Sequence, residues 1–120
     1  MQRDMDLVRQ ILIELEQNDV ARYKQMDVPG YDDAQVGYHC YLLHQAGLIV
    51  ASEFDTHDHI LPYYLPMHLT WDGHEFLNSV KSPSDWERVK KSVIQPAGGF
   101  VFSLAKDFIL HELKTRTGIA

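Results

Sequence analysis

The 120-residue sequence has a single cysteine, Cys40, and no long apolar run. One cysteine forms neither an intrachain disulfide nor a multi-cysteine zinc site. No stretch approaches the roughly 20 apolar residues of a membrane-spanning helix, and the first four residues lack the apolar core of a signal peptide. The composition, with 45% hydrophobic and 23% charged residues, is typical of a globular protein. We therefore expect one soluble, cytoplasmic domain.

Positive charge is missing from the middle of the chain. Residues 25–80 contain no lysine or arginine and carry eight carboxylates, whereas residues 1–24 have a net charge of −1 and residues 81–120 a net charge of +3. Carboxylates gathered in this way repel polyanions at long range. The pattern disfavours nucleic acid as a partner of the central segment and favours a protein with a basic surface.

Recognisable catalytic motifs are absent as well. The sequence has no phosphate-binding loop, no serine elbow and no paired catalytic carboxylates in a recognisable context. Cys40 and His44 are four residues apart, a spacing that would suit a thiolate–imidazole pair. Because Cys40 falls on the predicted apolar stripe of its helix, we expect a buried structural cysteine instead. We predict a protein that is not an enzyme and needs no cofactor.

Seven histidines raise the question of a metal site. His57 and His59 flank Asp58, and His68 lies on the strand predicted to run opposite. A zinc site needs three or four converging ligands, whereas this pattern brings two together. A polar loop, with no metal bound, is the expectation.

Apolar spacing and capping residues predict the secondary structure. The pattern predicts a helix over about residues 4–17 and a second helix from residue 32 or 33 to residue 46, which Gly47 ends as a left-handed cap. Short strands near 48–53 and 63–69 pair as a hairpin, with Pro66 at an edge or bulge. Thr70 caps a helix over 71–80, and Ser82 caps one over 83–94. A last helix spans about 100–115. For residues 20–31, strand and poorly formed helix both remain open.

This order of elements resembles the winged helix-turn-helix superfamily. Together with several short sequence motifs, it resembles specifically a bacterial and phage family of unknown function, the domain numbered twenty-five thirteen. The motifs are Arg-Asp-Met-Asp-Leu at 3–7, Tyr-His at 38–39 before Leu-Leu at 42–43, Ala-Gly-Leu-Ile at 46–49, Leu-Thr-Trp-x-Gly-His-x-Phe-Leu at 69–77, and a tryptophan helix near residue 86. The resemblance covers about residues 2–115. It implies a mainly α, winged-helix-like fold with a small antiparallel β wing. Residues 1–80 would be the core and 81–120 a helical extension of the same domain. It implies no reaction.

The resemblance implies that the helix over 33–46 corresponds to the helix that reads DNA in winged-helix proteins, usually with cationic and amide side chains. Here it has no lysine or arginine. Two functions therefore remain open. One is a regulatory or adaptor domain that acts through protein contacts. The other is a winged-helix DNA-binding transcriptional regulator of bacterial or phage origin. It would bind DNA either through this helix, which the missing cations disfavour, or through the basic C-terminal third around Lys81, Arg88, Lys90 and Lys91.

The predicted partner surface combines the outward face of this helix with the acidic wing. Its members are Tyr38, Tyr41, Leu42, Gln45, Glu53, Asp55 and Asp58. Tyrosines on a solvent-facing surface are typical of interfaces. The alternative is that residues 20–31 fold over the tyrosines and make them part of the core.

The last predicted helix has apolar residues on two faces, and one small domain covers two such faces with difficulty. We therefore predict a homodimer or a partner-bound form. The predicted contacts are Phe100, Val101, Leu104, Phe108, Ile109 and Leu113.

Overall fold

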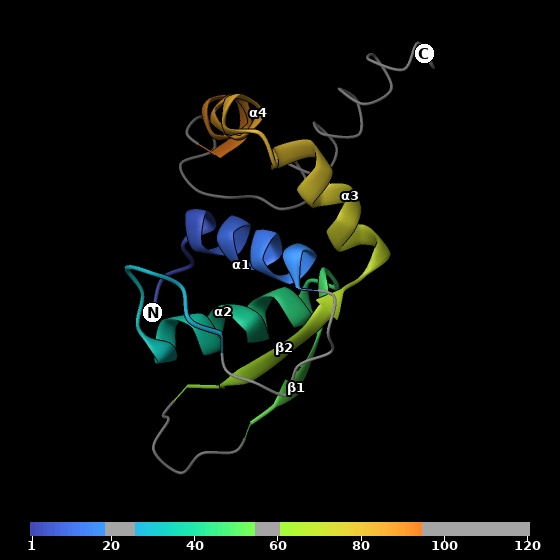
Figure 1. The fold of residues 1–120 in the computed structure, drawn as a ribbon. Coiled ribbons are helices and arrows are strands. Elements are labelled where there is room, and N and C mark those ends of the chain that lie inside the picture. Colours follow the sequence, from blue (N-terminus) through green and yellow to red (C-terminus); the bar gives the residue numbers. More distant parts are fainter. Residues whose placement is uncertain (19–25, 55–60, 95–120) are drawn as a thin grey trace. The chain divides into compact units, whose positions relative to one another are not determined.

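The computed structural model describes residues 1–18, 26–54 and 61–94. The elements in chain order are α1 (Met5–Gln17), α2 (Asp33–Gln45), β1 (Ile49–Glu53), β2 (Tyr64–Leu69), α3 (Trp71–Val80), α4 (Pro83–Val89) and a π-helical turn, η1 (Lys90–Ile94) (Figure 1). The described chain is thus mainly helical with one small two-stranded antiparallel sheet, as predicted. No helix in these three ranges is long and apolar enough to cross a membrane.

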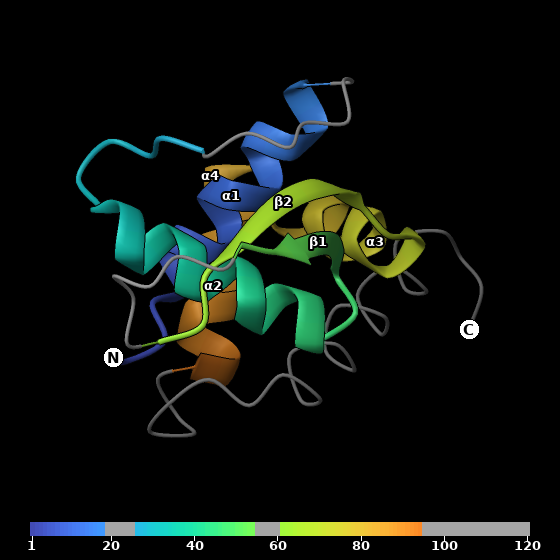
Figure 2. The same cartoon turned by 90° about the horizontal axis from the view of Figure 1, so that it is seen from below.

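The chain divides into two compact units, Met1–Glu75 and Phe76–Ala120, and α3 runs from the first into the second. In the first unit, α2 contacts both strands, and α1 contacts α2 and β2. The view from below shows α2 lying alongside the hairpin (Figure 2). The predicted helix over 100–115 lies outside the described residues.

The start of α1 is fixed by a side-chain cap, as the sequence predicts. The Asp4 Oδ1 atom accepts hydrogen bonds from the backbone N–H groups of Asp6 and Leu7, with N···O distances of 3.0 and 3.2 Å. These bonds satisfy N–H groups that have no partner inside the first turn. The buried stripe of the helix consists of Leu7, Val8, Ile11 and Leu12.

The hairpin has one irregularity, which lies where proline enters it. Ile49 pairs with Leu69 and Glu53 with Tyr64, and the register shifts between Val50 and Ala51. Pro66, which has no N–H to donate, lies opposite Ala51 beside this bulge. The predicted position of the proline at an edge or bulge is confirmed.

The end of α2, the start of β1 and the start of α3 meet in one hydrogen-bonded cluster, which we call the Gly47–Thr70 junction. Gly47 has a φ of +77°, and the Leu48 N–H donates to the Leu43 carbonyl over 3.0 Å, so α2 ends in the predicted left-handed cap. The Thr70 hydroxyl donates to the Gly47 carbonyl over 2.6 Å and accepts from the Gly73 N–H over 3.0 Å. The Thr70 N–H donates to the Leu48 carbonyl over 3.1 Å. Thr70 therefore caps α3, as predicted, and also ties it to the end of α2.

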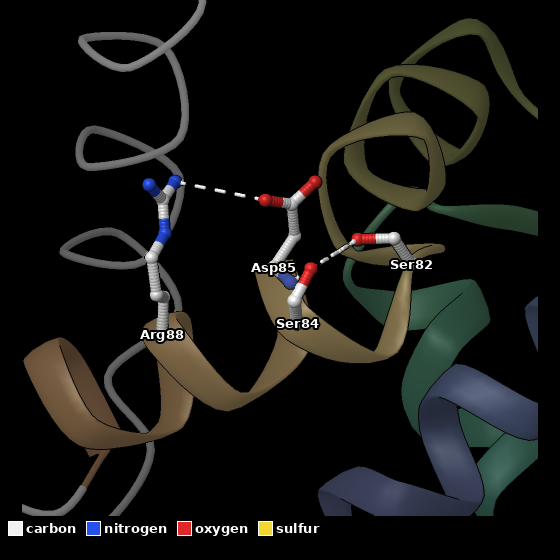
Figure 3. A network of polar contacts seen from close by, with 4 residues as sticks. All are labelled: Ser82, Ser84, Asp85 and Arg88. Atoms are coloured by element: carbon white, nitrogen blue, oxygen red, sulfur yellow. Dashed lines mark hydrogen bonds and ion pairs between the residues drawn. The ribbon is translucent and has the colours of Figure 1, made fainter.

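In the second unit, helix α4 has the predicted serine cap at its N-terminus. The Ser82 hydroxyl accepts from the Asp85 N–H over 3.1 Å and lies 3.3 Å from the Ser84 hydroxyl (Figure 3). The Arg88 guanidinium lies 3.7 Å from the Asp85 carboxylate, and the Lys90 ammonium lies 3.3 Å from that of Glu87. Two of the basic residues in this region therefore have an acidic partner three residues earlier. The predicted helix over 83–94 is α-helical as far as Val89 and continues as η1.

Gly73 gives a direct test of the Gly47–Thr70 junction. A methyl group at this position would collide with the Leu48 carbonyl oxygen, which is backbone and cannot rotate away. Alanine in a helix is ordinarily better than glycine by about 1 kcal/mol. We nevertheless expect Gly73→Ala to lower the free energy of unfolding in urea by roughly 1–3 kcal/mol, as overpacking does. Asn78→Ala, at an exposed site on the same helix, should not lower it. A Gly73→Ala protein as stable as the wild type would contradict the described packing.

Candidate functional site

A row of aromatic side chains lies at the surface of the first unit. Tyr38, Tyr41 and His44 follow one another at three-residue intervals along α2, which places them on one side of the helix. Tyr64 joins them from β2. The ring centroids are 5.9 Å apart for Tyr38 and Tyr41, 5.2 Å for Tyr41 and Tyr64, and 5.5 Å for Tyr64 and His44. We call these four side chains the aromatic row.

Hydrogen bonds hold two members of the row in place. The Gln45 side-chain amide donates to the Tyr41 hydroxyl over 2.8 Å. The His44 Nδ1 atom accepts from the Ala51 backbone N–H over 3.3 Å. The three tyrosines are half-buried and His44 is exposed. Rings that are already ordered lose little conformational entropy when a partner covers them, so the row is suited to recognition.

The structure describes five of the seven predicted partner residues, and they differ in burial. Tyr38, Tyr41 and Leu42 are half-buried, and Gln45 and Glu53 are exposed. The tyrosines are therefore neither free in solvent nor part of the core. Asp55 and Asp58 lie outside the described residues, as do residues 19–25, so that part of the proposed covering segment is not described.

Sequence analysis missed two members of the row. Tyr64 appeared only as part of a strand, and His44 only as a possible partner of Cys40. The three-residue spacing from Tyr38 through Tyr41 to His44 is the signal that identifies His44. The position of Tyr64 follows from the strand register, which one sequence does not specify.

Carboxylates border the row, and the segment that forms it has no lysine or arginine. Asp32 and Asp33 lie exposed at the N-terminal end of α2, and Glu53 pairs with Tyr64 in the strand register. No lysine or arginine occurs anywhere in residues 25–80. The first unit has thirteen carboxylates and four cationic side chains, a net charge of −9. The row therefore belongs to a unit with a large negative net charge.

The opposite side of α2 faces the core. Its buried residues are Val36, Gly37, His39, Cys40 and Leu43. The buried Tyr63 ring packs directly against the Cα of Gly37, where a methyl group would overlap it. Glycine at this position therefore lets the hairpin lie close to the helix.

Cys40 is a structural residue, as predicted. Its side chain is fully buried, and burial raises the pKa of the thiol to about 12. A thiol of this kind is not ionised at neutral pH and is a poor nucleophile. His44, the partner considered from the sequence, lies exposed and accepts its hydrogen bond from Ala51.

His39 is buried in the same face and was not identified from the sequence as a core residue. Its Nε2 atom lies 2.8 Å from the Asp4 backbone nitrogen, and its Nδ1 atom lies 2.7 Å from the Gln35 carbonyl oxygen. A backbone N–H can only donate and a carbonyl can only accept. Nδ1 therefore carries the proton, Nε2 accepts, and the ring is neutral.

Asp4 links this histidine to helix α1 and to Tyr31. Its backbone N–H donates to His39, its Oδ1 atom caps α1, and its Oδ2 atom accepts from the Tyr31 hydroxyl over 3.1 Å. Residues far apart in sequence are thereby joined around one aspartate, and we call this cluster the Asp4–His39 latch.

Other predicted sites lie largely outside the described residues. His57, Asp58 and His59 lie there, and so does the whole predicted oligomerisation set at 100–113, which stays a prediction. His68 is exposed, with Nδ1 2.9 Å from the Leu69 carbonyl oxygen. Within residues 1–18, 26–54 and 61–94, no three potential metal ligands of the His, Cys, Asp or Glu type come together.

Comparison with known proteins places the chain in a family. The model of a family described as hypothetical protein (DUF2513) matches residues 2–99. A relative from Haemophilus influenzae, described as an uncharacterized protein, is 34% identical over 95 residues, which cover 78% of this chain and 79% of the relative. No solved structure matches. The chain therefore belongs to the DUF2513 family, as its sequence motifs indicated.

The latch predicts a specific dependence of stability on pH. Burial lowers the pKa of His39 in the folded state, and the nearby Asp4 and Arg3 charges act in opposite directions. An unfolded histidine titrates near about 6.5, so between that pH and the lower folded pKa the unfolded state binds more protons. The contribution of His39 to stability is therefore complete above about pH 6.5 and is lost as the pH falls.

Urea denaturation at about pH 7.5 and about pH 5 measures this loss. The free energy of unfolding of the wild type should fall over this range by more than that of His39→Gln, which keeps a polar amide but cannot titrate. The other titrating groups are the same in both proteins. Equal losses would show that His39 is not held neutral.

Proposed function

We propose that this DUF2513 member is a non-enzymatic regulatory or adaptor domain that binds a protein with a basic surface through the aromatic row. The observation that carries the proposal is the row itself: four ordered rings at the surface of a unit with net charge −9. We further propose that it acts in the cytoplasm, on a winged-helix-like scaffold.

The chemistry of the row supports a protein partner. Tyrosine combines a large apolar ring with a hydroxyl that can pair at a wet interface, and aromatic residues dominate the binding energy of many interfaces. The row has both properties, since its tyrosines are half-buried and the Tyr41 hydroxyl already accepts a hydrogen bond. A partner that completes the burial gains apolar contact at low entropic cost.

The charge supports a basic partner. Rim charges of one sign speed the encounter with a surface of the opposite sign and exclude surfaces of the same sign. Asp32, Asp33 and Glu53 provide such a rim near the row.

The same features weaken the DNA-binding alternative. In a winged-helix arrangement, α2 would take the place of the recognition helix. Binding to duplex DNA depends on contacts between cations and phosphates, and α2 has no lysine or arginine. In the C-terminal third, Arg88 and Lys90 lie beside Asp85 and Glu87, which reduces the positive charge available to phosphates.

Replacing one ring separates recognition from folding. Tyr41→Ala should lower the free energy of unfolding by only about 1 kcal/mol, the scale of an aromatic pair at a half-buried site. Benzoylphenylalanine placed at position 38 should photo-crosslink in bacterial cells to a discrete basic protein, and the additional Tyr41→Ala change should remove the adduct. The same crosslinker at Gln17, exposed at the end of α1, serves as the control.

Three results would count against the proposal. Equal adducts from positions 38 and 17 would show unspecific contact. A stability loss of roughly 3–5 kcal/mol for Tyr41→Ala would identify the ring as core. Salt-sensitive nanomolar binding to random duplex in fluorescence anisotropy, instead of the high-micromolar binding or weaker that we expect, would favour the transcriptional regulator.

A further inference from the structure

Trp71 is the most exposed large hydrophobic side chain in the described part of the chain. Its exposed fraction is 79%, compared with 46% for Phe54 and 39% for Leu61. Tryptophan is on average among the more buried residues. The only other tryptophan, Trp86, follows that rule at 4% exposure. The fold therefore places a large ring in water at the first residue of α3.

The backbone that carries this ring is firmly held. Trp71 directly follows Thr70, whose N–H and hydroxyl bond to Leu48 and Gly47 in the Gly47–Thr70 junction. Two residues later, Gly73 packs against the Leu48 carbonyl. The contacts of the junction explain why threonine is needed at position 70 and glycine at position 73. They involve no packing of the Trp71 ring. A rigidly mounted ring exposed to water has the character of an interface anchor.

The residues that follow the ring along α3 include two carboxylates. Asp72 follows in the first turn of α3, and Glu75 lies one turn further on. The C-terminal end of α2, which carries the negative end of the helix dipole, is joined to Thr70 and has no lysine or arginine in its last turn. The face of a tryptophan ring attracts lysine and arginine.

The two tryptophans differ in this respect. The Lys90 ammonium lies 5.6 Å from the centroid of the Trp86 ring. Within the described ranges, no lysine or arginine takes the corresponding place over Trp71. In the described residues, Trp86 thus has a lysine near its ring, whereas Trp71 is exposed to solvent next to carboxylates.

We propose that Trp71 binds a lysine or arginine side chain of a basic protein partner by a cation–π contact, and that it forms a second anchor in addition to the aromatic row. The proposal rests on the proposed function for the class of partner. It commits to a basic polypeptide because the unit carries a net charge of −9 and has no cation in residues 25–80.

The experiment uses the full chain and a defined probe, a capped peptide of four Arg-Gly repeats, with four Gln-Gly repeats as the neutral match. Isothermal titration calorimetry at low salt should detect binding of the arginine peptide but not of the glutamine peptide. Trp71→Ala should weaken binding about five-fold, the scale of an exposed cation–π contact, and Trp71→Phe should weaken it less. Added salt should weaken it further. Circular dichroism checks that each variant is folded.

Fluorescence tests whether the ring is accessible. Acrylamide should quench the emission that is lost in Trp71→Phe, since the remaining Trp86 is buried. Resistance of the Trp71 emission to acrylamide would mean that the chain itself, or a second copy, covers the ring, and would overturn the proposal. Sedimentation at several concentrations distinguishes those two occupants.

The remaining outcomes separate this proposal from the proposed function. If Tyr41→Ala weakens the binding of the arginine peptide and Trp71→Ala does not, the aromatic row stands and the Trp71 site is wrong. If Trp71→Ala weakens it and the crosslink at position 38 fails, the Trp71 site stands and the row is wrong. Absence of arginine-peptide binding at low salt, or equal binding of the glutamine peptide, overturns the cation site.

Discussion

The hydrogen bond from the Asp4 backbone to the His39 imidazole, together with the buried residues around it, holds one face of α2 toward the core. Over 2.8 Å it joins the first residue before α1 to the middle of α2. The same aspartate caps α1 and accepts from Tyr31. With His39 held inward and Gly37 pressed against Tyr63, the side of α2 that carries Tyr38, Tyr41 and His44 can only face outward. The candidate binding surface is a consequence of what the core demands of the other face.

The sequence motifs on which the family resemblance was based meet in pairs in this fold. The motif at residues 3–7 contacts the motif at 38–39 through the Asp4–His39 latch. The motif at 46–49 contacts the motif at 69–77 through the Gly47–Thr70 junction. These two clusters join the helices and the hairpin of the first unit. Several residues of these motifs therefore serve to hold the fold together. Tyr38 and Trp71 also belong to these motifs, but their side chains are half-buried and exposed, respectively. The functional proposals use these two residues.

The parts of the fold that were predictable depend on local chemistry. Asp4 and Ser82 cap helices because their side chains reach N–H groups two or three residues away, and Gly47 ends α2 because it tolerates a positive φ. Pro66 indicated the irregular edge of the hairpin because it has no N–H. Each of these inferences needs only a few neighbouring residues.

What could not be predicted depends on long-range packing. The bond between Asp4 and His39 spans 35 residues. Helical spacing places His39 on the same face as the buried Val36 and Leu43, but its hydrogen-bond partner lies in another helix cap and could not be predicted from α2. The half-buried state of Tyr41 depends on Tyr64, whose position follows from strand register and a bulge. The close contact of Gly73 with the Leu48 carbonyl, two residues after the exposed Trp71, likewise joins residues far apart in sequence.

The most direct test of this account is the nitrogen chemical shifts of His39, measured by NMR on uniformly ¹⁵N-labelled protein as the pH is lowered. The account predicts a protonated Nδ1 and an unprotonated Nε2, in a neutral ring that persists below the usual histidine range of about 6.5. The Asp4 amide signal should stay shifted by its hydrogen bond over the same range. A ring that exchanges between tautomers and titrates near the ordinary value would contradict the account, because α2 would then lack the bond that turns the aromatic row outward.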